Sequence, residues 1–191
     1  MRFHGPDLSV KRFEILHELA PQAKRVGIIY NANYPANKSQ LEALHPAAAA
    51  VGISLVEIPI KSVADIEADL QAREAAADIG MDAILIITDD LSQSPDGWSI
   101  ISQFAANHNI PIAGSAAFEA DTGAIVSYIP DSFETGKLAA PLADKIFKGT
   151  PAGSIPVLTP ESDLRINYKL AQQLGLTVPE GLLSQATQII R

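Results

Sequence analysis

Cysteine is absent from this sequence of 191 residues. Its absence excludes disulfides, thiolate nucleophiles and cysteine-ligated metals, and it leaves an oxidising compartment permitted but not indicated. Basic clusters are also missing, because lysine and arginine nowhere adjoin in more than a pair, while the formal net charge is -8 and the pI is about 4.9. Such a chain is a poor partner for nucleic acid or for an anionic membrane surface.

Long apolar runs and targeting signals are absent too. No stretch approaches the length of a transmembrane helix. Residues 1–7, MRFHGPD, do not combine a basic segment with an apolar one as a secretory signal would. As written, the chain is expected to be cytoplasmic, or to be a piece of a longer protein.

Motifs for cofactors and metals are missing as well. Neither GxGxxG nor GxxxxGK[ST] occurs, so the sequence predicts no phosphate-binding glycine loop and no cofactor. The histidines show no metal-ligand spacing and lie far from any candidate nucleophile, which predicts solvated surface side chains and no metal site. They are His4, His17, His45 and His108.

Short apolar runs and amphipathic segments alternate along the first two thirds of the chain. With 47% hydrophobic residues, one or two small domains can form a core. The strict alternation predicts an α/β fold with a doubly wound parallel sheet in three α/β/α layers. Strands are expected at Val26–Tyr30, Ser54–Ile58, Ala83–Ile87 and Pro111–Ala113, and helices at Ser9–Ala20, Lys38–Val51, Val63–Ala77 and Gly97–Ala106.

Two of the expected helices contain a proline. Pro46 should kink its helix or split it into a loop and a shorter helix, and Pro141 interrupts a helix expected over Ser132–Phe147. Asp131 and Glu134 have the spacing of a capping box at the start of that second helix.

The remaining segments after residue 115 are shorter. We expect a turn-rich segment at Phe118–Gly123, strands at Ala124–Ile129, Ile155–Leu158 and Leu164–Asn167, a helix at Tyr168–Leu174, and a final helix that opens at Thr177–Pro179.

Polar side chains follow the expected strands where they end. In open α/β sheets, ligands bind outside the carboxyl ends of the strands. Neutral polar groups with nearby aromatic rings suit reversible binding of a small molecule. The alternative is that any first strand of such a domain ends in a polar turn. The strand-end set is Asn31, Asn33, Thr88, Asp89, Ser115 and Asp131, with Tyr30, Tyr34 and Tyr128 nearby.

Asp89 and Asp90 form the most distinctive acidic feature. They could hold a metal, act as an acid-base pair or contact a ligand. Neighbouring residues at a strand end point to opposite sides, which disfavours a shared proton. A metal would need further carboxylates, but the neighbouring strand ends supply Asn31 and Ser115. We therefore favour hydrogen bonding, or capping of the following segment, over catalysis.

Several stretches resemble one bacterial family. They include KRFEILHELAPQAKRVGIIYNANYP, DAILIITDD, the long stretch from NIPIAGSAAFEADTG to the Lys-Gly-x-Pro exit of the middle helix, and above all the ending NYKLAQQLGLTVP. The chain from Leu8 onward is similar to the substrate-binding proteins of ABC transporters with a type I periplasmic fold. The branch in question includes proposed tryptophan and other amino-acid binders.

This resemblance implies two lobes that enclose a ligand between them. Residues 1–23 would be a linker and first helix, 24–128 with 159–191 the ligand-binding lobe, and 129–158 a crossover segment and helix that packs on a first lobe absent here. The family's signal peptide and lipid-anchoring cysteine are also absent. The positions that would contact ligand are Asn31, Asn33, Thr88, Asp89, Ser115, Tyr128 and Asp131.

The resemblance also implies partners and a location. The ligand would be an amino acid or a related small molecule, the partner an ABC permease, and the location extracytoplasmic. With its first lobe missing, the apolar side of the helix at 132–148 would lead to a homodimer or a domain swap. Two alternatives remain open: an intracellular ligand sensor built on one lobe, and an α/β enzyme that uses Asp89 or Asp90.

Overall fold

The computed structural model describes residues 5–158 and 160–191. Its seven-stranded sheet has the order β2-β1-β3-β4-β5-β6-β7, and neighbouring strands are parallel except for the antiparallel pair of β5 and β6. The strands are β1 (Arg25–Asn31), β2 (Ser54–Ile60), β3 (Ala83–Leu85), β4 (Ile112–Gly114), β5 (Val126–Pro130), β6 (Ser162–Asn167) and β7 (Gln188–Ile190). The α-helices are α1 (Gly5–Leu19), α2 (Asn37–Ala50), α3 (Val63–Glu74), α4 (Pro95–His108), α5 (Ala117–Thr122), α6 (Ser132–Phe147), α7 (Tyr168–Gln173) and α8 (Glu180–Gln185).

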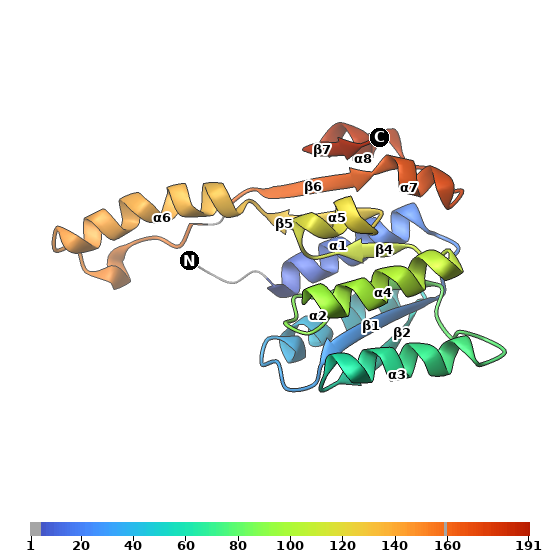
Figure 1. Cartoon of the computed structure of the whole chain (residues 1–191). Coiled ribbons are helices and arrows are strands. Elements are labelled where there is room, and N and C mark those ends of the chain that lie inside the picture. The colour runs from blue at the N-terminus through green and yellow to red at the C-terminus, as the bar shows by residue number, and fades with distance from the viewer. Residues whose placement is uncertain (1–4, 159) are drawn as a thin grey trace.

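The sheet is covered on both faces (Figure 1). Leu85 belongs to a core cluster that includes residues of α1, α2, α7 and α8, whereas its neighbours Ile84 and Ile86 belong to a second cluster with residues of α3 and α4. Successive residues of a strand point to opposite faces, so a strand buried on both sides must be apolar throughout. The predicted doubly wound α/β architecture is confirmed, with β6 and β7, which are parallel to each other, running antiparallel to the other five strands.

The predicted split of the helix at Pro46 is wrong. The helix α2 continues from Asn37 to Ala50 with Pro46 inside it. Leu41 and Leu44 before the proline and Ala48 after it are all buried in the core cluster that contains α1. Burial of both halves of the helix against the same core stabilises it enough to offset the loss of the hydrogen bond that a proline removes.

Three local predictions also need correction. Residues 118–123 are not an irregular turn, because α5 occupies most of them. The segment 155–158 forms no strand, and it follows a single 3-10 turn at Ala152–Ser154. Strand β7 was not predicted, because its three residues are too few to show a period.

The start of α6 is capped differently from the prediction. The Asp131 carboxylate accepts hydrogen bonds from the backbone amides of Phe133 and Glu134, as an N-cap should. The reciprocal half of the capping box is not formed. The Asp131 amide instead donates to the carbonyl of Glu161, and the Glu134 side chain pairs with Lys137.

Residues 131–158 and 160–161 form a projection from the body of the molecule, which we call the arm (Figure 1). Strand β5 runs out into α6, and the chain returns along the arm to β6, which explains why these two strands are antiparallel. No residue of α6 is buried. Phe133 is 72% exposed and Phe147 is 88% exposed, so the arm carries an apolar surface without cover from the described body.

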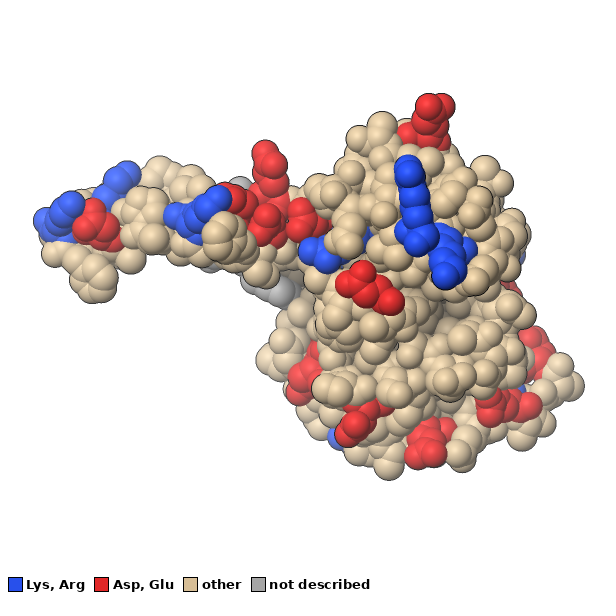
Figure 2. Space-filling view, turned by 45° about the horizontal axis from the view of Figure 1, so that its top comes forward, with Lys and Arg blue, Asp and Glu red and all other residues tan. Residues whose placement is uncertain are grey.

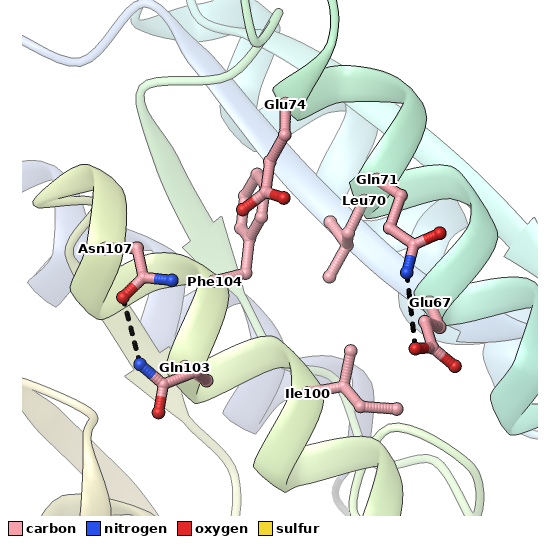
Figure 3. Close-up of a pocket in the computed structure, with 8 residues that line it drawn as sticks. All are labelled: Glu67, Leu70, Gln71, Glu74, Ile100, Gln103, Phe104 and Asn107. Carbon is pink, nitrogen blue, oxygen red and sulfur yellow. Dashed lines mark hydrogen bonds between the residues drawn. The ribbon is translucent and has the colours of Figure 1, made fainter.

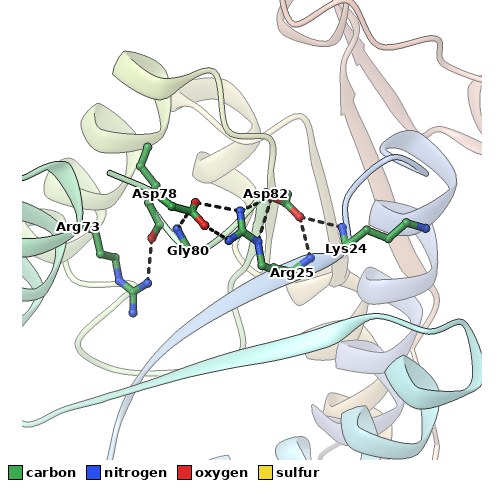
Figure 4. A network of polar contacts seen from close by, with 7 residues as sticks. Lys24, Arg25, Arg73, Asp78, Gly80 and Asp82 are labelled. Carbon is green, nitrogen blue, oxygen red and sulfur yellow. Dashed lines mark hydrogen bonds and ion pairs between the residues drawn. The ribbon is translucent and has the colours of Figure 1, made fainter. Parts of the chain in front are cut away.

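An ion-pair network closes the amino-terminal edge of the sheet (Figure 4). The Arg25 guanidinium contacts Asp78 at 2.5 Å and Asp82 at 2.8 Å, and Asp82 also accepts the backbone amides of Lys24 and Arg25. Hydrogen bonds from Arg25 lower the pKa of both carboxyl groups. This network ties β1 to the segment before β3, at the opposite end of the sheet from the strand-end residues.

Candidate functional site

The carboxyl ends of β1, β3 and β4 form one edge of the sheet, on the side from which the arm leaves the body (Figure 1). Asn31 connects the first two of these ends. Its backbone amide donates to the Asp89 carboxylate at 2.7 Å, and its side-chain amide donates to Asp90 at 2.8 Å. Its side-chain oxygen accepts the amide of Asn33 at 2.9 Å. The structure therefore brings Asn31, Asn33 and Asp89 together, as their positions in the sequence predicted.

Asp89 is buried, with 2% of its surface exposed. Its Oδ2 accepts hydrogen bonds from the Asn31 amide and from the Asn37 side chain, at 2.7 and 2.8 Å. Its Oδ1 accepts the backbone amides of Leu91 and Ser92, each at 2.9 Å. Asp89 thus fixes the loops after β1 and β3, which agrees with the predicted hydrogen-bonding and capping role. Asp90, by contrast, is exposed.

Two side chains of α2 complete this framework and were missed in the sequence. The Gln40 side chain accepts the Thr88 amide and donates to the Thr88 carbonyl, both at 3.0 Å, as another backbone segment would. Ser9 of α1 donates to the same Gln40 oxygen at 2.7 Å. Asn37 and Gln40 lie three residues apart and share the inward side of α2 with Leu41 and Leu44. That helical spacing was the available signal for two buried amides.

Ser115 follows β4, next to the end of β3. Its hydroxyl donates to the carbonyl of Ile87 at 3.3 Å. The backbone amides of Ser115 and Ala116 both donate to Glu119 Oε2, at 2.5 and 2.9 Å. This second buried carboxylate holds the turn after β4 in the way that Asp89 holds the loops after β1 and β3.

Glu119 is fully buried, with 0% exposure. Burial raises its pKa from the usual 4.5 to about 7, although the two amide donors and the nearby Arg12 guanidinium favour the charged form. Arg12 is itself buried on α1 and donates to the Ile86 carbonyl at 2.8 Å, and burial lowers its pKa to about 10. Neither residue was predicted, because charged side chains on helices usually face solvent.

Tyr128 lies on β5, beside β4 and Ser115, and Asp131 follows that strand directly. The β4–β5 register places Ser127 opposite Gly114, so Tyr128 lies one residue further, level with Ser115. Tyr128 is half-buried against the core, and Asp131 caps the helix of the arm. All seven predicted positions therefore lie at the same end of the sheet, with Asp131 at the base of the arm.

The buried Glu119 predicts a pH dependence of stability. Because folding raises its pKa, the folded state holds this proton more tightly than the unfolded state. The stability gained in this way is complete below about pH 4.5 and is lost as the pH rises through about 7. In Glu119→Gln the side chain cannot titrate. As the pH rises from 5 to 8, the free energy of unfolding of the variant should therefore increase by about 2–3 kcal/mol relative to that of the wild type.

Urea unfolding at both pH values measures this difference. Asp121→Asn is the matched control, because it makes the same acid-to-amide change at an exposed position of the same helix. The free energy of unfolding of Asp121→Asn should differ from that of the wild type by nearly the same amount at both pH values. An equally constant difference for Glu119→Gln would show that Glu119 does not titrate in this range.

Other surfaces offer weaker candidates. A groove of about 260 Å³ lies between α3 and α4 and contains none of the strand-end residues (Figure 3). The visible face in Figure 2 carries acidic side chains scattered over the body, a small basic group on the upper body, and both signs on the arm, without a continuous basic surface. Among the described residues, no three acidic or histidine side chains gather to hold a metal ion. In the same part of the chain, no helix is both long enough and apolar enough to span a membrane.

Several known proteins are similar to this chain in fold and in sequence. The tyrosine-binding protein of Clostridioides difficile (strain R20291) is 29% identical over 167 residues, which are 87% of this chain and 47% of that protein. A conserved domain protein from Vibrio cholerae O1 biovar El Tor strain N16961 is 30% identical, with a TM-score of 0.76 over 95% of this chain and 60% of that chain. An ABC domain from Streptococcus pneumonia in complex with L-Trp is 24% identical, with a TM-score of 0.80 over 98% of this chain and 62% of that chain.

The chain spans about half to three fifths of the length of these proteins. The family described as ABC transporter substrate binding protein has a model that matches residues 7–190. Because this match covers almost the whole sequence, the chain belongs to the ABC transporter substrate-binding protein family.

Proposed function

We propose that this chain is the ligand-binding lobe of a solute-binding protein for an ABC-type importer, and that its ligand is an amino acid with an aromatic side chain. The observation that carries the proposal is the construction of the carboxyl edge. Asn31, Asn33 and Ser115 belong to loops whose backbones are fixed by two buried carboxylates, Asp89 and Glu119. Loops fixed in this way can bind a small polar molecule without a large cost of ordering.

The edge contains partners for both charges of an amino acid. Helix α2 starts beside Asn33 and has no side-chain cap, and the start of a helix favours an anionic group such as a carboxylate. The carboxylates of Asp90 and Asp131 can accept hydrogen bonds from an ammonium group. Tyr128 adds an aromatic ring at the same end of the sheet. The name of the tyrosine-binding relative supports this class of ligand.

The domain division predicted from the sequence remains part of the proposal. We infer that residues 24–128 and 159–191 form the ligand-binding lobe, that 129–158 cross to the family's first lobe, and that 1–23 are the linker and helix that lead into the ligand-binding lobe. An open edge cannot enclose a ligand by itself, because specific pockets bury most of a ligand's surface. The proposed site is thus completed by the first lobe, and binding by this chain alone should be weak.

Family membership also supports the remaining parts of the proposal: an extracytoplasmic location, an ABC permease as partner, and no enzymatic activity. An internal observation favours a binding role over an enzyme based on Asp89. Both Asp89 oxygens already accept two hydrogen bonds each from the protein, so the carboxylate is committed to holding the loops. The sensor alternative makes a different prediction for the following experiment.

A thermal-shift screen against the proteinogenic amino acids tests the function. It should be run on this chain and on a longer form extended to the length of the relatives. A ligand that binds the native state raises the melting temperature by mass action. We expect L-tyrosine or L-tryptophan to stabilise the longer form more than this chain. Equal stabilisation of both forms would favour a one-lobe sensor, and no shift in either form would contradict an amino-acid ligand.

The arm predicts self-association of this chain. In the proposed two-lobe protein α6 covers the first lobe, and we propose that in this chain a second copy takes that place, as a homodimer or a domain swap through residues 132–148. Replacing both Phe133 and Phe147 by serine removes the two most exposed large apolar side chains of the arm. Sedimentation velocity should show a concentration-dependent dimer for the wild type and a monomer for this variant.

Val51→Ser is the control for that experiment, because Val51 is an exposed apolar residue of the body, 42% exposed. It should sediment as the wild type does. A wild-type chain that stays monomeric at high concentration would contradict self-association, and it would leave the amino-acid proposal intact.

A further inference from the structure

We propose that Glu119 is a positioning residue for ligand binding, whose ionised carboxylate holds the Ser115–Ala116 turn in its binding geometry and whose protonation loosens that turn. The inference rests on the proposed function, because it assumes that the ligand contacts Ser115. Glu119 itself is buried and would not touch the ligand.

The geometry links Glu119 directly to the turn. One oxygen, Oε2, accepts both backbone amides, at 2.5 Å from Ser115 N and 2.9 Å from Ala116 N. The turn begins directly after β4 ends at Gly114, and its first two amides both donate to this carboxylate. Hydrogen bonds to an ionised acceptor are roughly twice as strong as those to a neutral one. The charge state of Glu119 therefore decides how firmly the turn is held.

The other carboxyl oxygen is poorly satisfied. Within the described residues, Glu119 Oε1 has no hydrogen-bond partner of normal geometry, although the Gln93 side chain lies close enough to favour the charged form. The nearby Ser127 hydroxyl is buried and also unpartnered in that part of the chain. A buried carboxylate that is fully bonded on one side and unbonded on the other is easily protonated.

The groups that face Glu119 come from several elements. Helix α1 contributes the Arg12 guanidinium, which attracts the carboxylate. The loop after β3 contributes Gln93, and β5 contributes Ser127, both neutral. Strand β4 contributes Gly114, where an added Cβ would lie 2.6 Å from Glu119 Oε2, so no side chain separates the carboxylate from the turn. Since Arg12 stays charged near neutral pH, Glu119 is the group that titrates.

The direct test is NMR of the wild-type chain without ligand. The amide proton signals of Ser115 and Ala116 should shift together between about pH 5 and pH 8, because their common acceptor changes its charge. In Glu119→Gln these two signals should stay constant, while in Asp121→Asn they should shift as in the wild type. Constant signals in the wild type would overturn the inference even if Glu119→Gln fails to fold.

Ligand titration supplies the functional readout. Calorimetric titration with L-tyrosine and L-tryptophan should show binding by the wild type and Asp121→Asn that weakens about threefold to tenfold from pH 8 to pH 5. Glu119→Gln should lose most of this pH dependence. Binding with the same pH profile in Glu119→Gln would overturn the inference. If neither this chain nor the longer form is stabilised in the thermal-shift screen, the proposed function fails. If this chain alone binds neither amino acid, the NMR titration decides whether Glu119 holds the turn.

Discussion

Replacing Asp89 by alanine is expected to lower the free energy of unfolding by about 3–5 kcal/mol, measured by urea unfolding. The carboxylate is 2% exposed and accepts four hydrogen bonds, three from backbone amides and one from Asn37. Alanine leaves these donors without an acceptor at a buried site, and each unsatisfied donor is costly. The loops after β1 and β3 should also lose their fixed conformation, so ligand binding should disappear with them.

Asp90→Ala is the matched control. The same acid is removed one residue further along, but Asp90 is exposed and accepts a hydrogen bond from the Asn31 side chain at 2.8 Å. Asp90→Ala should lower the free energy of unfolding by less than about 1 kcal/mol. Asp89→Asn should fall between the two, because an amide keeps the shape but turns one acceptor into a donor. A loss at position 89 no larger than that at position 90 would contradict the framework role of Asp89.

Gly97→Ala carries the second large prediction. Helix propensity alone favours alanine by about 1 kcal/mol in the first turn of α4. The structure predicts the opposite, because a Cβ on Gly97 would lie only 2.1 Å from the backbone carbonyl oxygen of Leu91. The loop that contains Leu91 is tied to Asp89, so it cannot yield freely. We expect a loss of about 2–4 kcal/mol in urea unfolding.

Gly181→Ala serves as the control for that substitution. Gly181 lies in α8, and an added Cβ would meet nothing within 4 Å. The same change should therefore be neutral, or stabilise the fold by up to about 1 kcal/mol. If both glycine variants behave alike, the contact between α4 and the Leu91 loop does not constrain the protein.

The predicted architecture followed from periodicity. Strand β3 could be recognised because five consecutive apolar residues end at Thr88 and two aspartates, a length and pattern typical of a strand buried on both faces. Of the two alternatives at Pro46, a kink or a split, the split was wrong because a local rule for proline takes no account of burial on a core that includes α1. The segment 155–158 has the composition of a strand but, in the arm, lies where no strand neighbours it.

The candidate site was predicted as a set of positions, since strand ends in a parallel sheet meet at one edge. The roles inside that set could not be predicted. Whether Asp89 faces a ligand or the protein depends on donors at Asn31 and Asn37, which lie more than fifty residues away along the chain. Glu119 and Arg12 were missed altogether, because nothing in a short local pattern distinguishes a buried charge from an exposed one.

The sequence by itself determined the fold class, the family and the positions of the candidate site at one end of the sheet, because these depend on apolar periodicity, turn residues and extended motifs that are local along the chain. The tertiary structure alone decided which polar groups are buried and what they hold. Hydrogen-bond partners and desolvation arise from residues that folding brings together from distant segments. For this reason Asp89 and Glu119 belong to the framework of the edge, while Asn33 and Asp90 face the solvent.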